Sequence, residues 1–219
     1  MSEKLIDYLE GFITQDRKAR IAEILLKRTN HIAVCVEDVY QLHNTSAVIR
    51  SCDVFGIQQL HVIEENYGKR LDKNIAMGAE KWVDVHRYET AAHCIASLKS
   101  DGFKIIATSP HQTSYPLKDF DISQKSVICF GTEKSGLSPA IMDQADGFIH
   151  IPMQGFAESL NISVSAAIVL YELRSRLNQS RIAWQLSEKE LEAKRVDWTM
   201  KSIRSIDDIL KRYNNEQSE

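Results

Sequence analysis

The chain has 219 residues, of which 43% are hydrophobic and 26% are charged, and its formal net charge is −3. This composition is ordinary for a soluble globular protein and supplies enough apolar residues for a sizeable core. No apolar run approaches the roughly 18 residues that a membrane span needs, and the N-terminal segment lacks the basic and apolar blocks of a secretory signal. Four scattered cysteines without a CxxC pair favour free thiols in a reducing cytosol over disulfides or a zinc site. We therefore expect a cytoplasmic protein with no membrane partner and no metal.

The charge is unevenly distributed along the chain. Residues 17–28 carry five basic residues against one acidic residue, and residues 174–212 carry ten against six, so each segment has a net charge of +4. Residues 29–173 carry eleven basic and seventeen acidic residues, a net charge of −6. Positive segments on both sides of an acidic middle indicate a footprint for a polyanion. The alternative is an ordinary basic patch on a helix surface.

The predicted elements alternate between helices and strands. Residues 3–30 have the apolar spacing of one or two amphipathic helices. Beyond them the pattern predicts strand 32–36, helix 44–55, strand 60–63, strand 82–85, helix 90–100, strand 104–108, strand 127–131, short helix 139–145, strand 147–150 and helix 162–177. From Gln179 onward the chain is again helical and strongly charged.

Strands that alternate with helices predict an α/β fold with a mostly parallel sheet flanked by helices, and short apolar strands fit burial on both faces. We expect an N-terminal helical arm over 1–29, an α/β domain over 30–178 and a C-terminal helical arm over 179–219. Trp184 and Trp198 lie in the second arm, where they either stack on bases or pack the arm helices.

Ligands of open α/β sheets bind beyond the carboxyl ends of the strands, which here are the loops 37–44, 108–114, 131–136 and 152–163. The GTEKSG loop is not a P-loop, because Leu137 follows its second glycine where the pattern needs lysine. No GxGxxG follows a predicted strand, and the seven histidines show no paired metal-ligand spacing. Ser159 and Ser163 lack the partners of a nucleophile elbow. These patterns argue against the commonest nucleotide, metal and acyl-transfer sites.

Three separated stretches carry a family resemblance: residues 44–50 (NTSAVIR), 130–137 (FGTEKSGL) and 151–165 (IPM followed by SLNISVS). In order and spacing they resemble the motifs of the trefoil-knotted (SPOUT) RNA ribose 2′-O-methyltransferases, over roughly residues 30–178. The resemblance implies a C-terminal deep trefoil knot, S-adenosylmethionine as cofactor and a homodimer with the last core helix in its interface. With helical extensions and no separate N-terminal RNA-binding domain, the chain most resembles members that methylate guanosine 18 in the D-loop of tRNA.

The resemblance also implies which residues form the site. The matched catalytic positions are Asn44, Arg50, Glu133, Ser159 and Asn161, and the matched cofactor positions are Thr108, Gly131, Ile151 and Leu160. Gly131 and Gly155 are expected to permit a close backbone approach. The arms would position tRNA through phosphate contacts.

Each matched polar residue also has an ordinary structural alternative. Asn44 could be a plain helix N-cap, and Arg50 could be half of a surface ion pair. Asn161 with Ser163 could simply cap the last helix, Ser159 could satisfy a turn N–H, and Glu133 could be an exposed loop carboxylate.

Three other functions stay open at this point. The first is the same chemistry at another tRNA position or on ribosomal RNA. The second, from a different class, is a non-catalytic RNA-binding or assembly protein with the same fold. A nicotinamide oxidoreductase comes last, because the glycine fingerprint is missing.

Overall fold

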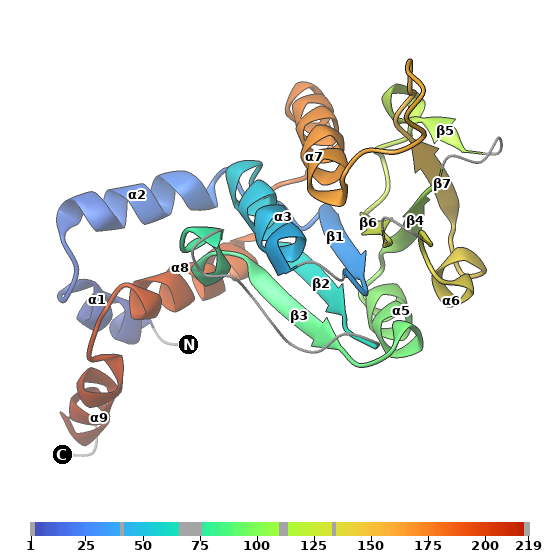
Figure 1. Cartoon of the computed structure of the whole chain (residues 1–219). Coiled ribbons are helices and arrows are strands. Elements are labelled where there is room, and N and C mark those ends of the chain that lie inside the picture. Colours follow the sequence, from blue (N-terminus) through green and yellow to red (C-terminus); the bar gives the residue numbers. More distant parts are fainter. Residues whose placement is uncertain (1–2, 40–41, 66–75, 110–113, 133–134, 217–219) are drawn as a thin grey trace. The chain divides into compact units, whose positions relative to one another are not determined.

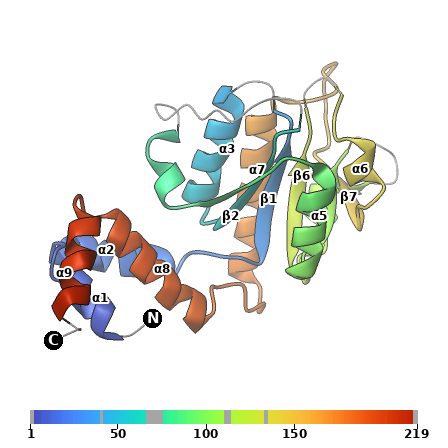
Figure 2. The same cartoon turned by 90° about the horizontal axis from the view of Figure 1, so that it is seen from below.

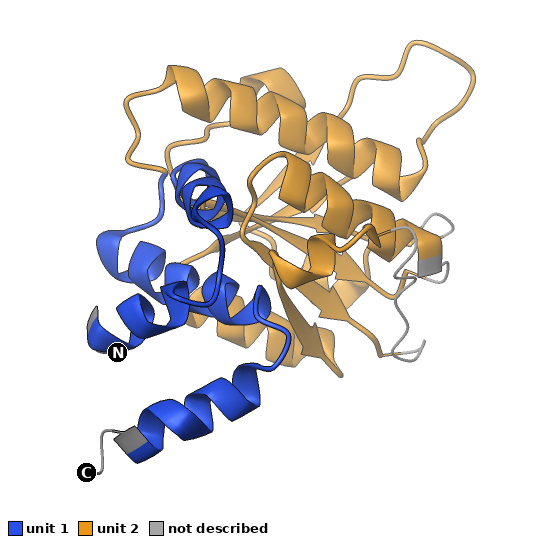
Figure 3. Cartoon of the chain, turned by 90° about the vertical axis from the view of Figure 1, so that its left-hand side faces the viewer, with its two compact units in different colours: residues 1–28, 185–219 blue, residues 29–184 orange. Residues whose placement is uncertain are grey.

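The computed structural model describes residues 3–39, 42–65, 76–109, 114–132 and 135–216. Contacts divide the chain into two compact units, one of Met1–Arg28 with Gln185–Glu219 and one of Thr29–Trp184 (Figure 3). Within the described ranges, every helix is too short or too polar to cross a membrane.

Residues 29–184 form one seven-stranded sheet in the order β3-β2-β1-β6-β4-β7-β5 (Figure 1). All of its strand pairings are parallel, so the predicted α/β fold is confirmed and the sheet is wholly rather than mostly parallel. The trefoil knot stays a prediction. The strands are β1 (Ile32–Glu37), β2 (Gln59–Ile63), β3 (Asp84–Tyr88), β4 (Lys104–Thr108), β5 (Tyr115–Pro116), β6 (Ser126–Phe130) and β7 (Gly147–His150).

Helices cover both faces of this sheet. Side chains alternate along a strand, so β1 directs Ile32, Val34 and Val36 into one apolar cluster and Ala33 and Cys35 into another. The first cluster includes residues of α3 (Leu42–Val54) and α7 (Ile162–Gln179), which lie side by side in Figure 2. The second includes residues of α5 (Ala91–Ser100) and α6 (Pro139–Met142). Burial on both faces explains why the central strands read as continuous apolar runs.

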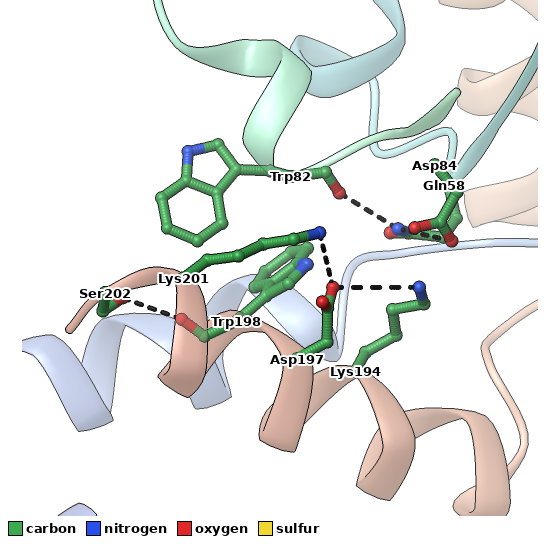
Figure 4. Close-up of polar contacts among 8 residues, drawn as sticks. All are labelled: Gln58, Trp82, Asp84, Lys194, Asp197, Trp198, Lys201 and Ser202. Atoms are coloured by element: carbon green, nitrogen blue, oxygen red, sulfur yellow. Dashed lines mark hydrogen bonds and ion pairs between the residues drawn. The ribbon is translucent and has the colours of Figure 1, made fainter. Parts of the chain in front are cut away.

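The third strand begins two residues later than the predicted 82–85. The chain first forms the short 3₁₀ turn η1 (Ala79–Lys81), which Trp82 ends. The Gln58 side-chain amide then donates to the Trp82 carbonyl (3.0 Å) and to Asp84 Oδ2 (3.2 Å), and the strand starts at Asp84 (Figure 4). A second 3₁₀ turn, η2 (Leu117–Asp119), directly follows β5.

The other unit is helical. It contains α1 (Glu3–Glu10), α2 (Gln15–Leu25), α8 (Glu188–Lys201) and α9 (Ile206–Glu216), with a small core of Ile6, Leu9, Val196 and Ile209. Ser187 and Glu190 form a capping box at the start of α8. Asp197 accepts a hydrogen bond from Lys201 Nζ (2.7 Å) and pairs with Lys194 (4.0 Å), as Figure 4 shows. That this helical unit positions tRNA stays a prediction.

Candidate active site at the carboxyl edge of the sheet

The sheet gathers the motif loops at one edge. Because all strands are parallel, the loops after β1, β4, β6 and β7 leave the sheet at the same side, and these four strands occupy adjacent places in it. From β1 the strand order runs outward to β2 and β3 on one side and to β6 on the other. Such a reversal is where α/β sheets bind ligands.

Asn44 and Asn161 bring the first and third motifs together. The Asn161 amide donates from Nδ2 to Asn44 Oδ1 (3.1 Å), which joins the N-terminal ends of α3 and α7. Asn44 is buried, and it lies inside the first turn of α3 because that helix begins at Leu42. The alternative of Asn44 as a plain N-cap is therefore wrong.

Asn161 does cap α7. Its Oδ1 accepts hydrogen bonds from the Ser163 backbone N–H (2.8 Å) and hydroxyl (2.6 Å), while Nδ2 reaches Asn44. The capping role and the contact with the first motif therefore coexist in one side chain.

Arg50 lies apart from this asparagine pair. Six residues along an α-helix correspond to about 240° of rotation beyond one full turn, so Arg50 and Asn44 occupy different faces of α3. Arg50 is exposed and forms neither a hydrogen bond nor an ion pair with any residue in the described part of the chain. The ion-pair alternative therefore has no partner there, and the guanidinium is available to a polyanion or a second chain.

The second motif is a tightly closed loop. Thr132 and Gly136 exchange two backbone hydrogen bonds of 2.9 Å, and Gly136 has a φ of +70°. A Cβ at Gly131 would lie 2.1–2.3 Å from backbone atoms of Gly136 and Leu137. The close approach at Gly131 is therefore to the loop's own backbone. Glu133, the matched catalytic position in this loop, lies outside the described residues.

The matched cofactor positions follow three adjacent strands. The Thr108 hydroxyl donates to the Cys129 carbonyl (2.9 Å), which ties β4 to β6. Ile151 is half-buried against the larger core cluster, whereas residues 152–160, Leu160 included, are exposed. Of the two large apolar side chains among these positions, only Ile151 therefore packs against the core.

The third loop gives a different result for each of two residues. A Cβ at Gly155 would meet nothing within 4 Å, so this glycine has no close protein neighbour, and its approach to a cofactor stays a prediction. Ser159 is exposed and forms no hydrogen bond with any described residue, so it satisfies no turn N–H among them.

Two polar pairs at this edge escaped the sequence analysis. Glu37, the last residue of β1, accepts hydrogen bonds from the Ser138 backbone N–H (2.7 Å) and hydroxyl (2.6 Å). The Ser114 hydroxyl and His150 Nδ1 are hydrogen-bonded at 2.7 Å where β5 meets β7. The only advance signal was the Ser138-Pro139 dipeptide, which is typical of a helix start.

The two arm tryptophans pack. Trp184 lies against the larger core cluster with the Arg174 guanidinium 3.6 Å from its ring centroid. Trp198 is 1% exposed, and the Arg28 guanidinium lies 5.0 Å from its ring centroid. An indole that is buried to this degree offers no face to a base.

A cavity of about 430 Å³ lies elsewhere on the sheet. Lys104, Ser126 and Gly147 line it, and these are the first residues of β4, β6 and β7, so it opens at the amino edge. No group of three or more metal-ligating side chains occurs among the residues that the structure describes. The motif residues therefore define a site at the carboxyl edge, away from this cavity.

Comparison with known proteins identifies the family. A model of the SpoU rRNA methylase family matches residues 31–171. The tRNA (guanosine(18)-2′-O)-methyltransferase of Borreliella burgdorferi is 42% identical over 85% of this chain and 86% of its own length. The enzyme of the same name from Thermus thermophilus is 33% identical over 86% of this chain and 98% of its own.

Solved structures agree with this match. The crystal structure of the A. aeolicus TrmH/SpoU tRNA modifying enzyme superposes with a TM-score of 0.76 and 32% identity, over 86% of this chain and 98% of that one. The SpoU methyltransferase AviRb from Streptomyces viridochromogenes, in complex with AdoMet, shares the fold with a TM-score of 0.63 and 23% identity, over 72% and 65% of the two chains. By family match, sequence identity and fold, the chain belongs to the SpoU methylase family.

Proposed function

We propose that the chain transfers the methyl group of S-adenosylmethionine to the ribose 2′-hydroxyl of guanosine 18 in tRNA. The observation that carries this proposal is the 42% identity to a tRNA (guanosine(18)-2′-O)-methyltransferase over 85% of the chain. The asparagine contact that joins the first and third motifs at the sheet's carboxyl edge supports it.

The cofactor supplies an electrophilic methyl group on a sulfonium centre. Thr108, Gly131, Ile151 and Leu160 would hold it, since they lie at or beyond the ends of β4, β6 and β7. Amino-acid composition does not reveal such a site, because loops that bind a ligand through backbone groups need no characteristic side chains.

Arg50 would bind a phosphate beside the target ribose and stabilise the oxyanion that develops on the 2′-oxygen. A guanidinium offers five N–H donors and no acceptor, so Arg50 is poorly suited to be the base. A phosphate oxygen or water would take the 2′-hydroxyl proton. Glu133 would orient Arg50 or the substrate, and Asn44, Ser159 and Asn161 match the other active-site positions of the family.

The exposed side of α7 supports a homodimer. Val164, Ile168 and Tyr171 are spaced at helical intervals along it and are 45%, 39% and 63% exposed. A contiguous apolar stripe of this kind is typical of a protein interface. The dimer would bring a second chain close to the start of α7, where Asn161 lies.

The helical unit would contact tRNA phosphates. Part of its basic charge is already paired, as in the ion pair between Arg195 and Glu10 (2.5 Å). Arg17, Arg204, Lys211 and Arg212 are exposed and form no ion pair with described residues. A tRNA substrate and four free cysteines fit a cytoplasmic location.

Labelled-methyl transfer from S-adenosylmethionine to unmodified tRNA and ribosomal RNA transcripts tests the proposal, with the methylated nucleotide mapped afterwards. We expect label at guanosine 18 of tRNA. Arg50→Ala should abolish it, and Arg50→Lys should reduce it strongly, because lysine cannot bind a phosphate through two parallel hydrogen bonds. Label on ribosomal RNA alone would overturn the substrate, and cofactor binding without transfer to either RNA would favour a non-catalytic RNA-binding protein.

A further inference from the structure

A buried carboxylate lies at the centre of the carboxyl edge. Glu37 is the last residue of β1, the strand at which the strand order reverses, and it is only 4% exposed. One oxygen accepts from the Ser138 N–H and the other from the Ser138 hydroxyl, so both oxygens are used on one residue 101 positions away. No lysine, arginine or histidine of the described residues forms an ion pair with it.

Ser138 immediately follows the second motif loop. Its neighbour Leu137 is buried, and the backbone of Gly136 and Leu137 lies directly against Gly131. A displacement of Ser138 would therefore shift the backbone on which Gly131 rests. Gly131 in turn follows the last residue of β6 and is a matched cofactor position.

We propose that Glu37 is a positioning residue for the cofactor site: it holds Ser138, and through Ser138 it keeps the backbone of Gly136 and Leu137 against Gly131, in the arrangement that binds S-adenosylmethionine. This inference rests on the proposed function. Desolvation of a carboxylate is costly, and here two neutral donors compensate for it. The two hydrogen bonds to the Glu37 carboxylate restrain both the backbone and the side chain of Ser138, which a single hydrogen bond could not do.

The chain offers a matched control at the opposite edge of the sheet. Asp146 Oδ2 accepts from the Ile105 backbone N–H (2.8 Å), and Oδ1 accepts from Lys104 Nζ (3.3 Å). This is again a carboxylate that fastens a loop to a neighbouring strand, but it lies at the amino ends of β4 and β7. Asp146→Asn should therefore affect stability without affecting the cofactor site.

Calorimetric titration of S-adenosylmethionine and S-adenosylhomocysteine into the tRNA-free protein tests the proposal. We expect Glu37→Gln to raise Kd for both ligands about tenfold, the usual effect of losing a charged hydrogen bond. Ser138→Ala keeps the backbone donor and should raise Kd by about threefold. Asp146→Asn should leave Kd unchanged. In turnover, Glu37→Gln should raise KM for S-adenosylmethionine, leave KM for tRNA unchanged and leave kcat within about twofold at saturating cofactor.

The outcomes separate the two proposals. If the wild-type chain binds neither ligand, the proposed function fails first. The inference is overturned if Glu37→Gln binds both ligands as tightly as wild type does. It is also overturned if KM for tRNA rises together with KM for S-adenosylmethionine, because Glu37 would then stabilise the fold in general and not the cofactor site. Should Glu37→Gln not fold, as judged by thermal unfolding beside Asp146→Asn, an unchanged Kd in Ser138→Ala overturns it instead.

Discussion

Two substitutions of Asn161 separate its two structural roles, the cap of α7 and the hydrogen bond to Asn44. Asn161→Ala deletes the cap of α7, at a typical cost of about 1 kcal/mol, and the bond to the buried Asn44, at about 1–2 kcal/mol. The expected loss in free energy of unfolding is therefore about 2–3 kcal/mol. Asn161→Ser keeps a good N-cap but is too short to reach Asn44, so it should cost only about 1–2 kcal/mol.

Urea-induced unfolding followed by far-UV circular dichroism measures both losses. At about 2–4 °C per kcal/mol for a chain of this size, Asn161→Ala should also lower Tm by about 5–10 °C. Equal losses in the two variants would show that the cap of α7 contributes nothing to the free energy of unfolding. A loss below about 0.5 kcal/mol in Asn161→Ala would show that neither the cap nor the bond to Asn44 stabilises the fold. If Asn161→Ser keeps most of its stability but loses methyl transfer, the residue also acts in the reaction.

Four further predictions follow from individual contacts. Gly131→Ala should destabilise by about 3 kcal/mol because its Cβ would overlap backbone, whereas Gly155→Ala, with no neighbour within 4 Å, should stay within about 0.5 kcal/mol in the same thermal assay. Burial lowers the pKa of His61 to about 3, so between pH 6.5 and 5 this imidazole takes up a proton in the unfolded chain and not in the folded one. The free energy of unfolding should therefore fall by about 2 kcal/mol over that pH range. In urea titrations, His61→Gln should reduce this dependence on pH. Ile168→Asp should shift the chain from dimer to monomer in sedimentation, while Asp143→Ala, an exposed change elsewhere, should not. Arg212→Ala should lower the slope of log tRNA affinity against log salt by about one, and an unchanged slope would exclude that phosphate contact.

Local pattern predicted the central strands to within one residue at each end. The strands 104–108 and 147–150 match β4 and β7 to the residue, and the bounds of the fully buried β1 and β6 differ by at most one residue from the predicted 32–36 and 127–131. The prediction failed at the sheet margins. β5 has only two residues and cannot show a period, and β3 is a half-exposed edge strand whose polar residues hid its true start at Asp84.

Helix starts were less accurate for a related reason. Asn44 has the residue type of an N-cap, which suggested a helix beginning there, yet its side chain bonds to Asn161 and the helix starts at Leu42. A side chain with two competing partners cannot be assigned from local sequence. Of the two asparagines considered as helix caps, only Asn161 is one, and its capping partner Ser163 is two residues away.

The same limit explains the candidate site. Its three motifs could be found as strings, but the contacts that shape it join residues 117, 101 and 36 positions apart: Asn44 with Asn161, Glu37 with Ser138, and Ser114 with His150. Which residues meet depends on strand order, and β1 lies beside β6 through a pairing that no local pattern contains. Once that order is known, the end of β1 and the exit of the β6 loop must be neighbours. A buried glutamate at the end of β1 then becomes a reason to test the cofactor loop.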